Sequence, residues 1–459
     1  MPDRPLIAYE SGSAQNKILR LTDVTKNISF EIRFPHTARF ATPLLAGLSP
    51  GARYFVYFEG GWLENLYDTE HLRASRPDLV IHVLDLHSGE IIFSEPLLSP
   101  SYPQNLAQIA EMIKDDWSFT NSDATFEDVV AATQEMMLDH IRSVAWSPDS
   151  SLLGFAAQNP GPSSDLYFFR PETRTTWRVT ADPGHVLSAY WAPDSSALVM
   201  DTSLYNRHMR EDTTYVLSRD GSILKSFTSQ LWNFAGWRDP IHALFYSSTD
   251  SGDNVGVKAI SAKDGTTTMP WEGSFGDIAF SPDLSSFLLG SNMPSAPIPP
   301  SSGLFLGRRD REPLLKLSEV WGWGVAYWGS ERFAFAASSI DEGTVGVTLD
   351  GARAPVDDGY WNLAASPDGS YLAGYNKPLW GNLPGVQPGL RIFDGDGLAL
   401  VSIDNINVDC VRWNPASTAL AYQIESQLYL WDAVAGSSRL IADQLDQDDC
   451  AFEWVRDTP

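Results

Sequence analysis

One short pattern recurs along most of this 459-residue chain at a nearly constant spacing. Its clearest copy, "VAWSPDSSLLGFAA", is an apolar stretch, a Ser-Pro-Asp turn and a second apolar stretch. We take the residue before the turn as the anchor of each copy. The anchors are Leu48, Trp146, Trp191, Trp237, Phe280, Tyr327, Ala365, Trp413 and Trp454. From Trp146 onward they lie 38 to 48 residues apart, a period that indicates a repeat architecture.

Each copy continues with two more apolar stretches joined by a polar hairpin, as in "TYVLSRDGSILKSF" and "GLRIFDGDGLALVSI". The Asp-Gly pairs supply the positive φ that a tight hairpin requires. One unit is therefore four strands, which is the content of one β-propeller blade. Proline sets φ in the Ser-Pro-Asp turn and aspartate accepts backbone N–H groups, so we expect these aspartates to be structural, not catalytic.

The repeated unit W-S-P-D-x-x-x-L/I-A-F/Y resembles the WD-repeat and TolB-type β-propeller families over almost the whole chain. The Trp-Asp dipeptide of WD repeats occurs in its strand position once, at Trp431-Asp432, and a Gly-His pair once, at Gly184-His185. The repeats therefore look closer to the TolB type, which is also seen in the non-catalytic propellers of prolyl-peptidase relatives. The repeats leave no length for an accompanying α/β hydrolase domain, which removes peptidase activity from what the resemblance implies.

The two ends of the chain carry halves of one unit. Anchors Leu48 to Trp413 open eight units, and the ninth, at Trp454, can be completed only by residues 5–33. We therefore predict that residues 450–459 pair with residues 5–33 in a closing blade, which seals the exposed strand edges of the ring. The predicted fold is a single all-β propeller over residues 1–459 with nine four-stranded blades. Eight blades is the alternative, if a weak unit is irregular.

Residues 101–141 break the period and fall between the second and third blades, the closing blade being the first. Apolar residues recur at helical spacing over 106–113 and again over 126–141, where Thr125 is a suitable helix cap. We predict an α-helical insertion of two helices. It is either a packing elaboration or a lid or docking element, because long insertions on rigid scaffolds often carry function.

The charge balance restricts the kinds of partner that the chain can bind. The chain has 32 Lys and Arg against 58 Asp and Glu, a net charge of −26, which excludes nucleic acid and anionic membrane surfaces and favours cationic partners. No apolar run of 18 residues predicts a membrane span, and the N-terminus has no signal-peptide core. We expect a soluble, monomeric ring, cytoplasmic by default, although a mature exported chain would look the same.

The two cysteines occupy nearly equivalent places on adjacent units, Cys410 three residues before Trp413 and Cys450 four before Trp454. A disulfide needs Cα atoms within about 7 Å, a separation that neighbouring inner strands approach but often miss. We therefore expect two buried thiols, with a bridge as the alternative. The small number of cysteines and the absence of paired histidines exclude a disulfide scaffold and a zinc site.

Tryptophans form the first candidate binding site. Several of them directly precede the first strand of a unit, where loops converge on one mouth of the channel, and another lies in a long loop. The set is Trp232, Trp271, Trp321, Trp323, Trp361 and Trp380. An aromatic rim of this kind suits sugars, prolines or cations. The alternative is that these side chains pack between neighbouring blades.

Two acidic loops of adjacent units form the second candidate site. Their best-placed carboxylates belong to Asp404, Asp409, Asp446 and Asp448. Clustered carboxylate and amide oxygens are the ligands that calcium uses, but the spacing is not that of an EF-hand. A solvated acidic rim is the alternative to a calcium site. We expect no other cofactor.

The sequence contains no nucleophile motif, phosphate-binding loop or pair of catalytic carboxylates in a recognisable context. We therefore expect no enzyme, but a scaffold that binds a protein or peptide partner, as the resemblance to WD-repeat and TolB-type rings implies. The alternative is a propeller that binds or acts on a glycan or small ligand at the aromatic mouth, with calcium. Fold alone does not separate the two.

Overall fold

The computed structural model describes most, but not all, of the chain, and structural statements below concern the described residues. These are residues 6–13, 16–35, 38–41, 44–60, 79–99, 125, 128, 144–158, 164–181, 184–206, 209–228, 232–248, 254–272, 277–281, 285–291, 303–308, 311–318, 322–328, 332–337, 344–348, 352–357, 362–376, 389–404, 406–445 and 450–455.

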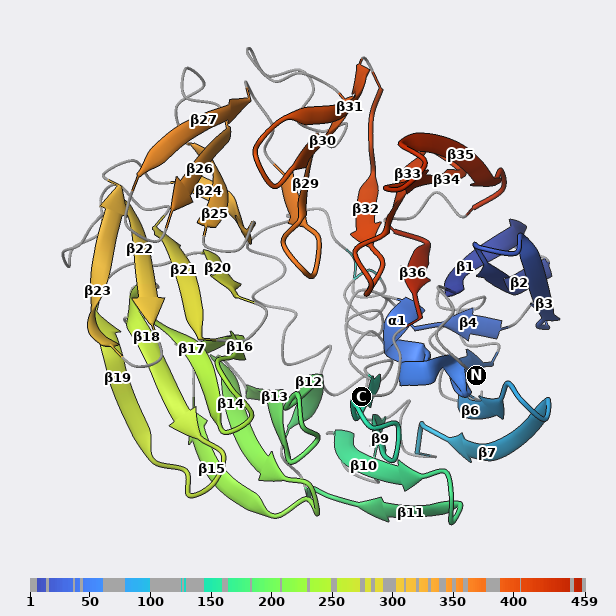
Figure 1. Ribbon diagram of the computed structural model, residues 1–459. Coiled ribbons are helices and arrows are strands. Elements are labelled where there is room, and N and C mark those ends of the chain that lie inside the picture. The colour runs from blue at the N-terminus through green and yellow to red at the C-terminus, as the bar shows by residue number, and fades with distance from the viewer. Residues whose placement is uncertain are drawn as a thin grey trace.

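The described residues form nine four-stranded antiparallel sheets arranged in a ring around a central axis (Figure 1). The prediction of an all-β propeller with nine blades is confirmed. The units anchored at Tyr327 and Ala365, on which the eight-blade alternative depended, each form a complete sheet. We number the blades from the one that contains the N-terminal strands.

The first five blades have the following strands. Blade 1 consists of β36 (Phe452–Trp454), β1 (Leu6–Ser13), β2 (Asn16–Asp23) and β3 (Ile28–Arg33). Blade 2 consists of β4 (Ala38–Phe40), β5 (Tyr54–Glu59), β6 (Val80–Asp85) and β7 (Glu90–Pro96). Blade 3 consists of β8 (Val144–Trp146), β9 (Leu153–Gln158), β10 (Ser164–Arg170) and β11 (Thr175–Arg178). Blade 4 consists of β12 (His185–Trp191), β13 (Ala197–Asn206), β14 (Met209–Ser218) and β15 (Ile223–Thr228). Blade 5 consists of β16 (Trp232–Trp237), β17 (His242–Ser248), β18 (Asn254–Ser261) and β19 (Thr267–Glu272).

Four blades complete the ring. Blade 6 consists of β20 (Asp277–Phe280), β21 (Ser286–Ser291), β22 (Gly303–Arg308) and β23 (Arg311–Ser318). Blade 7 consists of β24 (Gly322–Tyr327), β25 (Arg332–Ala337), β26 (Thr344–Thr348) and β27 (Arg353–Asp357). Blade 8 consists of β28 (Asn362–Ala365), β29 (Tyr371–Tyr375), β30 (Gly389–Asp394) and β31 (Ala399–Asp404). Blade 9 consists of β32 (Cys410–Trp413), β33 (Ala419–Ile424), β34 (Gln427–Asp432) and β35 (Ser437–Ala442).

The hydrophobic core lies in layers between adjacent blades. Every residue of β9 is buried, because neighbouring sheets cover both of its faces, whereas most of the outer strands β3 and β35 are exposed. One buried cluster joins blade 2 to blade 3, and another joins blade 9 to blade 1. Each blade therefore depends on both neighbours for its burial, as sheets packed face to face do.

Blade 1 contains both ends of the chain. Its inner strand β36 pairs antiparallel with β1, with Ile7 opposite Trp454 and Tyr9 opposite Phe452. Backbone hydrogen bonds flank the pair, from the Glu10 N–H to the Ala451 carbonyl at 3.0 Å and from the Val455 N–H to the Leu6 carbonyl at 2.9 Å. Figure 1 shows the C-terminal strand between the N-terminal blade and blade 9.

Blade 2 departs from the repeat. The expectation that its first strand ends at Leu48 is wrong, because that strand is β4 and ends at Phe40. The helical turn α1 (Leu44–Gly47) and the 3₁₀ turn η1 (Pro50–Ala52) follow before β5. Gly47 makes this possible, since a Cβ there would lie 2.8 Å from the Val56 carbonyl oxygen.

The predicted insertion at 101–141 lies outside the described residues, apart from Thr125 and Asp128. The Asp128 carboxylate accepts hydrogen bonds from the Thr125 N–H and Oγ1, at 2.7 and 2.8 Å, and the Asp128 N–H donates to Thr125 Oγ1 at 3.3 Å. This reciprocal pattern is that of a helix N-cap. No helix within the described ranges is long and apolar enough to cross a membrane.

Tryptophan anchors connect successive blades through their indole N–H groups. We call these hydrogen bonds the indole links. The donors and acceptors are Trp146 to Gly47 (3.2 Å), Trp191 to Ala145 (3.0 Å), Trp237 to Tyr190 (3.3 Å), Trp413 to Ala364 (2.8 Å) and Trp454 to Arg412 (2.8 Å). Each acceptor is a carbonyl of the preceding blade, so every link runs the same way around the ring. The last link joins blade 1 to blade 9.

Aromatic stacking reinforces the indole links. The Trp146 ring stacks on Tyr54 of blade 2, with centroids 5.6 Å apart and planes 13° apart. The Trp413 ring stacks in the same way on Tyr371 of blade 8, at 5.5 Å and 14°. Such pairs add about 0.5–1.5 kcal/mol beyond the area that they bury. The anchor tryptophan thus fixes the register between blades by a hydrogen bond and a stacked ring together.

Replacing Trp413 by phenylalanine keeps the stacked ring but removes the indole link. We expect Trp413→Phe to lower the free energy of unfolding by about 1–3 kcal/mol, because the Ala364 carbonyl loses its donor in a partly buried position. Urea unfolding measures the change. Trp177→Phe is the matched control, because within the described part of the chain Trp177 packs edge-on against Phe168 of its own blade. An equal loss in both variants would contradict a special role for the indole link.

Candidate functional site

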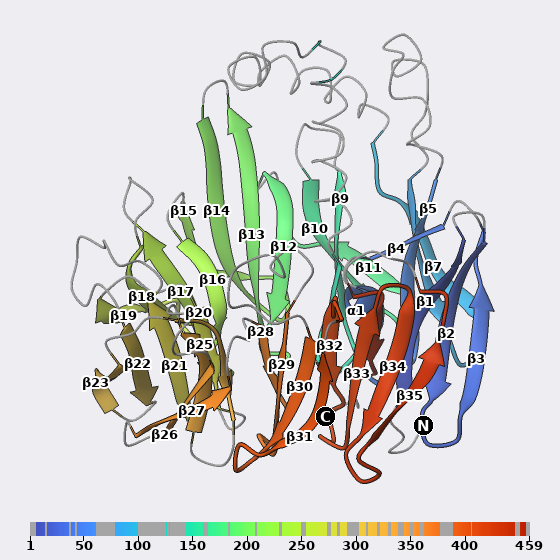
Figure 2. The same ribbon diagram turned by 90° about the horizontal axis from the view of Figure 1, so that it is seen from above.

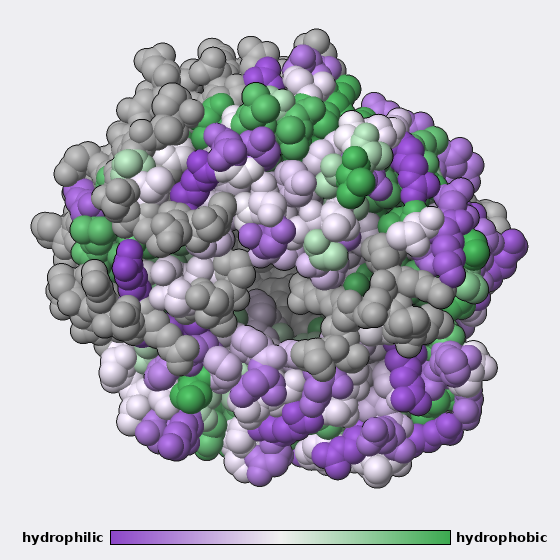
Figure 3. Space-filling model, in the orientation of Figure 1, coloured by the Kyte–Doolittle hydropathy of each residue, from purple (hydrophilic) through white to green (hydrophobic). Residues whose placement is uncertain are grey.

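The end of the ring that carries the Ser-Pro-Asp turns forms one candidate surface, which we call the turn face. The inner strands run toward it, and the C-terminus lies on this side (Figures 1 and 2). Figure 3 views this face and shows a hollow at the centre of the ring. At the opposite end the strands β13 and β14 extend beyond the other blades, as Figure 2 shows.

The aspartates of the Ser-Pro-Asp turns stabilise those turns by hydrogen bonds. Asp149 Oδ1 accepts hydrogen bonds from Ser147 Oγ at 2.7 Å and from the Ser151 N–H at 3.1 Å. Its own N–H donates to Ser195 Oγ, in the equivalent turn of blade 4, at 3.1 Å. Asp368 in blade 8 has the same arrangement, because its N–H donates to Ser417 Oγ of blade 9 at 3.0 Å. Each carboxylate therefore stabilises its own turn, and the backbone N–H of the same residue links that turn to the next one in blades 3 and 4 and in blades 8 and 9.

Arg219 ties two of these turns together. It extends from the β14–β15 hairpin of blade 4, donates to the Ser195 carbonyl at 3.0 Å and forms an ion pair with Asp149 of blade 3. Partial burial of Asp149 opposes its ionisation, but hydrogen bonds from Ser147, Arg219 and Ser151 outweigh that effect and lower its pKa to about 2. The turn face thus carries a fixed carboxylate–guanidinium pair at neutral pH.

Two aspartates inside the sheets have partners as well. The Asp165 side chain is fully buried, and it is 2.6 Å from the Arg178 guanidinium. Burial raises the pKa of Asp201, while hydrogen bonds from Thr214 and Ser188, at 2.6 and 3.2 Å, oppose the rise. Both carboxyl groups link neighbouring strands of one blade, and their contacts are those of structural groups.

The structure describes little of the predicted tryptophan rim. Trp321, Trp361 and Trp380 lie outside the described residues. Trp232 and Trp323 lie in the inner strands β16 and β24, but their side chains are not described. The placement of Trp271 in a loop is wrong, because it belongs to the outer strand β19 and pairs with Val257. Strand β19 extends to Glu272, beyond the point at which the sequence pattern suggests that the loop begins.

The acidic candidates do not gather within the described ranges. Asp446 and Asp448 lie outside them. Asp404, at the end of β31, accepts a hydrogen bond from Ser402 at 2.9 Å, and Asp409 accepts one from the Glu425 N–H at 2.8 Å. Among the residues that the structure describes, no group of three or more His, Cys, Asp or Glu side chains is placed to hold a metal ion. The calcium site stays a prediction.

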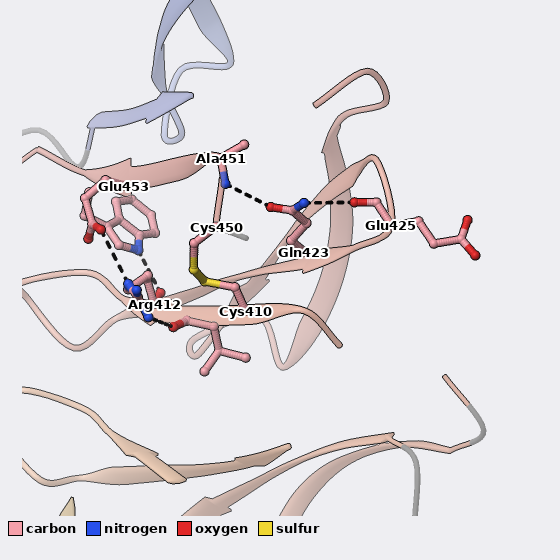
Figure 4. The surroundings of a disulfide bond; sticks show 9 residues. Cys410, Arg412, Gln423, Glu425, Cys450, Ala451 and Glu453 are labelled. Carbon is pink, nitrogen blue, oxygen red and sulfur yellow. Dashed lines mark hydrogen bonds and ion pairs between the residues drawn. A yellow bond between two sulfur atoms is a disulfide. The ribbon is translucent and has the colours of Figure 1, made fainter. Parts of the chain in front are cut away.

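The two cysteines form a disulfide, so the expectation of two buried thiols is wrong (Figure 4). Their Cα atoms are 5.4 Å apart. Cys410 opens β32 of blade 9, and Cys450 precedes β36 of blade 1 by two residues. The prediction failed because Cys450 adopts a left-handed backbone conformation, with φ of 60°, that brings it close to Cys410. Anchor spacing does not reveal such a turn.

A small polar network surrounds the disulfide (Figure 4). The buried Gln423 side chain accepts a hydrogen bond from the Ala451 N–H at 3.2 Å and donates one to the Glu425 carbonyl at 2.9 Å. Arg412 and Glu453 form an ion pair across the same junction at 3.4 Å. Blade 9 and blade 1 are thus joined near the disulfide by a covalent bond, an indole link and these polar contacts, and Arg439 adds hydrogen bonds to Val24 and Asn27 nearer the rim. The sequence singled out Cys410 and Cys450 but not this network.

The outer strands of two neighbouring blades carry exposed apolar side chains, a set that we call the β3/β7 face. It consists of Ile28 and Phe30 on β3 and Ile91 on β7, with 49%, 57% and 48% of their surface exposed. Phe30 pairs with Leu21, and Ile91 pairs with Leu84. Both partners belong to the buried cluster between blades 1 and 2, so the β3/β7 face continues that cluster to the surface. Sequence reasoning missed this site, although the alternation in "ISFEIRF" indicates an apolar face.

No family model and no curated protein sequence matches this chain. Its structure is similar to a eukaryotic initiation factor, with 12% identity, a TM-score of 0.49 and 99% of each chain covered. It is also similar to an acylaminoacyl peptidase of Pyrococcus horikoshii, with 13% identity, a TM-score of 0.39, and 85% of this chain and 51% of the peptidase chain covered. TolB from Acinetobacter baumannii is 13% identical, with a TM-score of 0.33, and the match covers 88% of this chain and 84% of TolB. Because each score is below 0.5, the fold assignment rests on the nine sheets themselves.

The depressed pKa of Asp149 predicts a pH effect on stability. The ionised Asp149 carboxylate contributes fully to the free energy of unfolding above the pKa of an unfolded aspartate, about 3.9. This contribution is lost as the pH falls toward about 2. We expect Asp149→Asn to abolish this part of the acid destabilisation, measured by urea unfolding between pH 5 and pH 2. Asp396→Asn, an exposed aspartate in the β30–β31 turn, is the control. Parallel pH profiles for wild type and Asp149→Asn would contradict the role of this carboxylate.

Proposed function

We propose that this chain is a non-catalytic scaffold that binds a protein or peptide segment at the β3/β7 face. The observation that supports it is the exposure of Ile28, Phe30 and Ile91, about half of each residue's surface, on the outer strands of two neighbouring blades. Burying these side chains against a partner contributes about 25 cal/mol for each Å² of apolar surface removed from water. Adjacent apolar side chains on two neighbouring blades are typical of interaction surfaces, whereas a single exposed one is ordinary.

The backbone edges of these strands favour an extended partner. β3 and β7 are the outermost strands of their sheets, so one edge of each has no partner strand among the described residues. An extended peptide that lies along such an edge gains main-chain hydrogen bonds, and its alternate side chains contact the apolar face. The net charge of −26 favours a basic segment with apolar side chains as the occupant.

The assignment of this chain as a scaffold for a protein or peptide partner follows the resemblance to WD-repeat and TolB-type rings, which mostly serve as interaction platforms. The tryptophan rim, without Trp271, belongs to the same proposal as a second contact region for the partner. A glycan-binding or enzymatic use of that rim, with calcium, is the competing function. No contact among the described residues favours it.

Surface variants test the proposal. We expect Phe30→Asp together with Ile91→Asp to abolish recovery of the partner from native lysate while the wild-type melting temperature is kept. Leu315→Asp is the matched control, because Leu315 lies on the outer strand β23 of blade 6 and is 50% exposed. The control should recover the same partner as wild type.

Affinity for the recovered partner should fall at least about tenfold in the double variant. The affinity of the wild-type chain should also fall with rising salt, because salt screens the attraction between a basic segment and an acidic ring. A partner that both variants recover equally well binds elsewhere, and that result would contradict the assignment of the β3/β7 face.

A further inference from the structure

The junction between blade 9 and blade 1 differs from a junction within the continuous chain. Elsewhere the inner strand of a blade continues into the second strand of that blade, as β32 continues into β33. In blade 1 the inner strand β36 has three residues, and the strand it pairs with, β1, comes from the other end of the chain. The β1–β36 pairing is therefore held by three residue pairs and is not continued by a covalent connection between the two strands.

Several weak contacts hold β36 to blade 9. Trp454 donates its indole N–H to the Arg412 carbonyl at 2.8 Å, and Glu453 forms an ion pair with Arg412 at 3.4 Å. Phe452 and Trp454 are buried in the cluster between blades 9 and 1. Each of these contacts is non-covalent, and each is made by one of the three residues of β36.

The disulfide is the covalent element of the junction. It links Cys410, 1% exposed at the start of β32, to Cys450, which is partly exposed and precedes β36. The closed loop spans 40 residues and contains strands β33 to β35 of blade 9. Breaking it releases β36 from blade 9 without altering any contact inside blade 9. The positive φ of Cys450 is unfavourable for a residue with a side chain, so the released segment also has a reason to relax.

We propose that the Cys410–Cys450 disulfide is a redox-controlled lock on the closing strand β36. In the oxidised chain the bond holds β36 on blade 9, in place to pair with β1, and in the reduced chain β36 separates from blade 9 and β1 and returns. This lock is independent of the partner site at the β3/β7 face, since that face lies between blades 1 and 2.

The reaction is thiol–disulfide exchange with a dithiol reductant. One thiolate of the reductant attacks the Cys450 sulfur, the more exposed of the two, and Cys410 leaves as a thiolate. The second thiol of the reductant then displaces Cys450 from the mixed disulfide. The protein gains two electrons and two protons as a pair of thiols, and the reductant ends as its own disulfide.

Hydrogen exchange read by mass spectrometry tests the lock on the full chain, air-oxidised or treated with dithiothreitol. We expect reduction to speed exchange of the amides in Ile7–Glu10 and Phe452–Val455 by roughly 100-fold, because the covalent restraint on opening is gone. Exchange in β17 of blade 5, far from the junction, should not change. The variant Cys410→Ser with Cys450→Ser should exchange at the fast rate with and without dithiothreitol.

Three results would overturn the proposal. Alkylation that finds two free thiols in the air-oxidised chain would show that the bond does not form. Equal exchange at the junction in both redox states would show that the bond restrains nothing there. An equal rise in β17 would show a general stabilising bond and no local lock. The wild-type comparison stands on its own if the serine variant does not fold.

Discussion

The packing of each blade against its neighbours is the constraint on which the ring depends, and among the described residues an indole link fixes it at five of the nine junctions. A propeller blade buries its apolar faces only against its neighbours, so the position of one blade relative to the next must be fixed at every junction. The anchor tryptophan does this in two ways, because its ring stacks on the preceding blade and its N–H bonds to a backbone carbonyl there. Since Trp454 makes the same link to blade 9, closure of the ring uses the interaction that builds it.

Closure also concentrates unusual features at one junction. Blade 1 is assembled from both ends of the chain, and the disulfide, the buried Gln423 and the Arg412–Glu453 pair all lie beside its inner strand. The β3/β7 face lies on the other side of the same blade. A chain of nine blades therefore has one blade at which the disulfide, solvent-exposed apolar surface and strands from both ends of the chain meet.

The blades could be predicted because turn chemistry and strand alternation are local. Ser147 and Asp149 form the turn contacts expected of Ser-Pro-Asp. Features that depend on an irregular backbone could not be predicted. The disulfide needs the left-handed conformation of Cys450, and the first strand of blade 2 is displaced from Leu48 by the turn α1. The β3/β7 face needs two blades in contact, which no single repeat encodes.

The chain forms a ring of nine blades that is closed by a strand from each end of the chain. Joining Pro459 directly to Met1 by a peptide bond tests this arrangement, because residues 455–459 and 1–5 would then form the turn between β36 and β1. The circular chain should fold without an added linker and melt higher than the linear chain by roughly 1–4 °C, since the unfolded state loses entropy. A circular chain that fails to fold, or that melts lower, would contradict the shared blade.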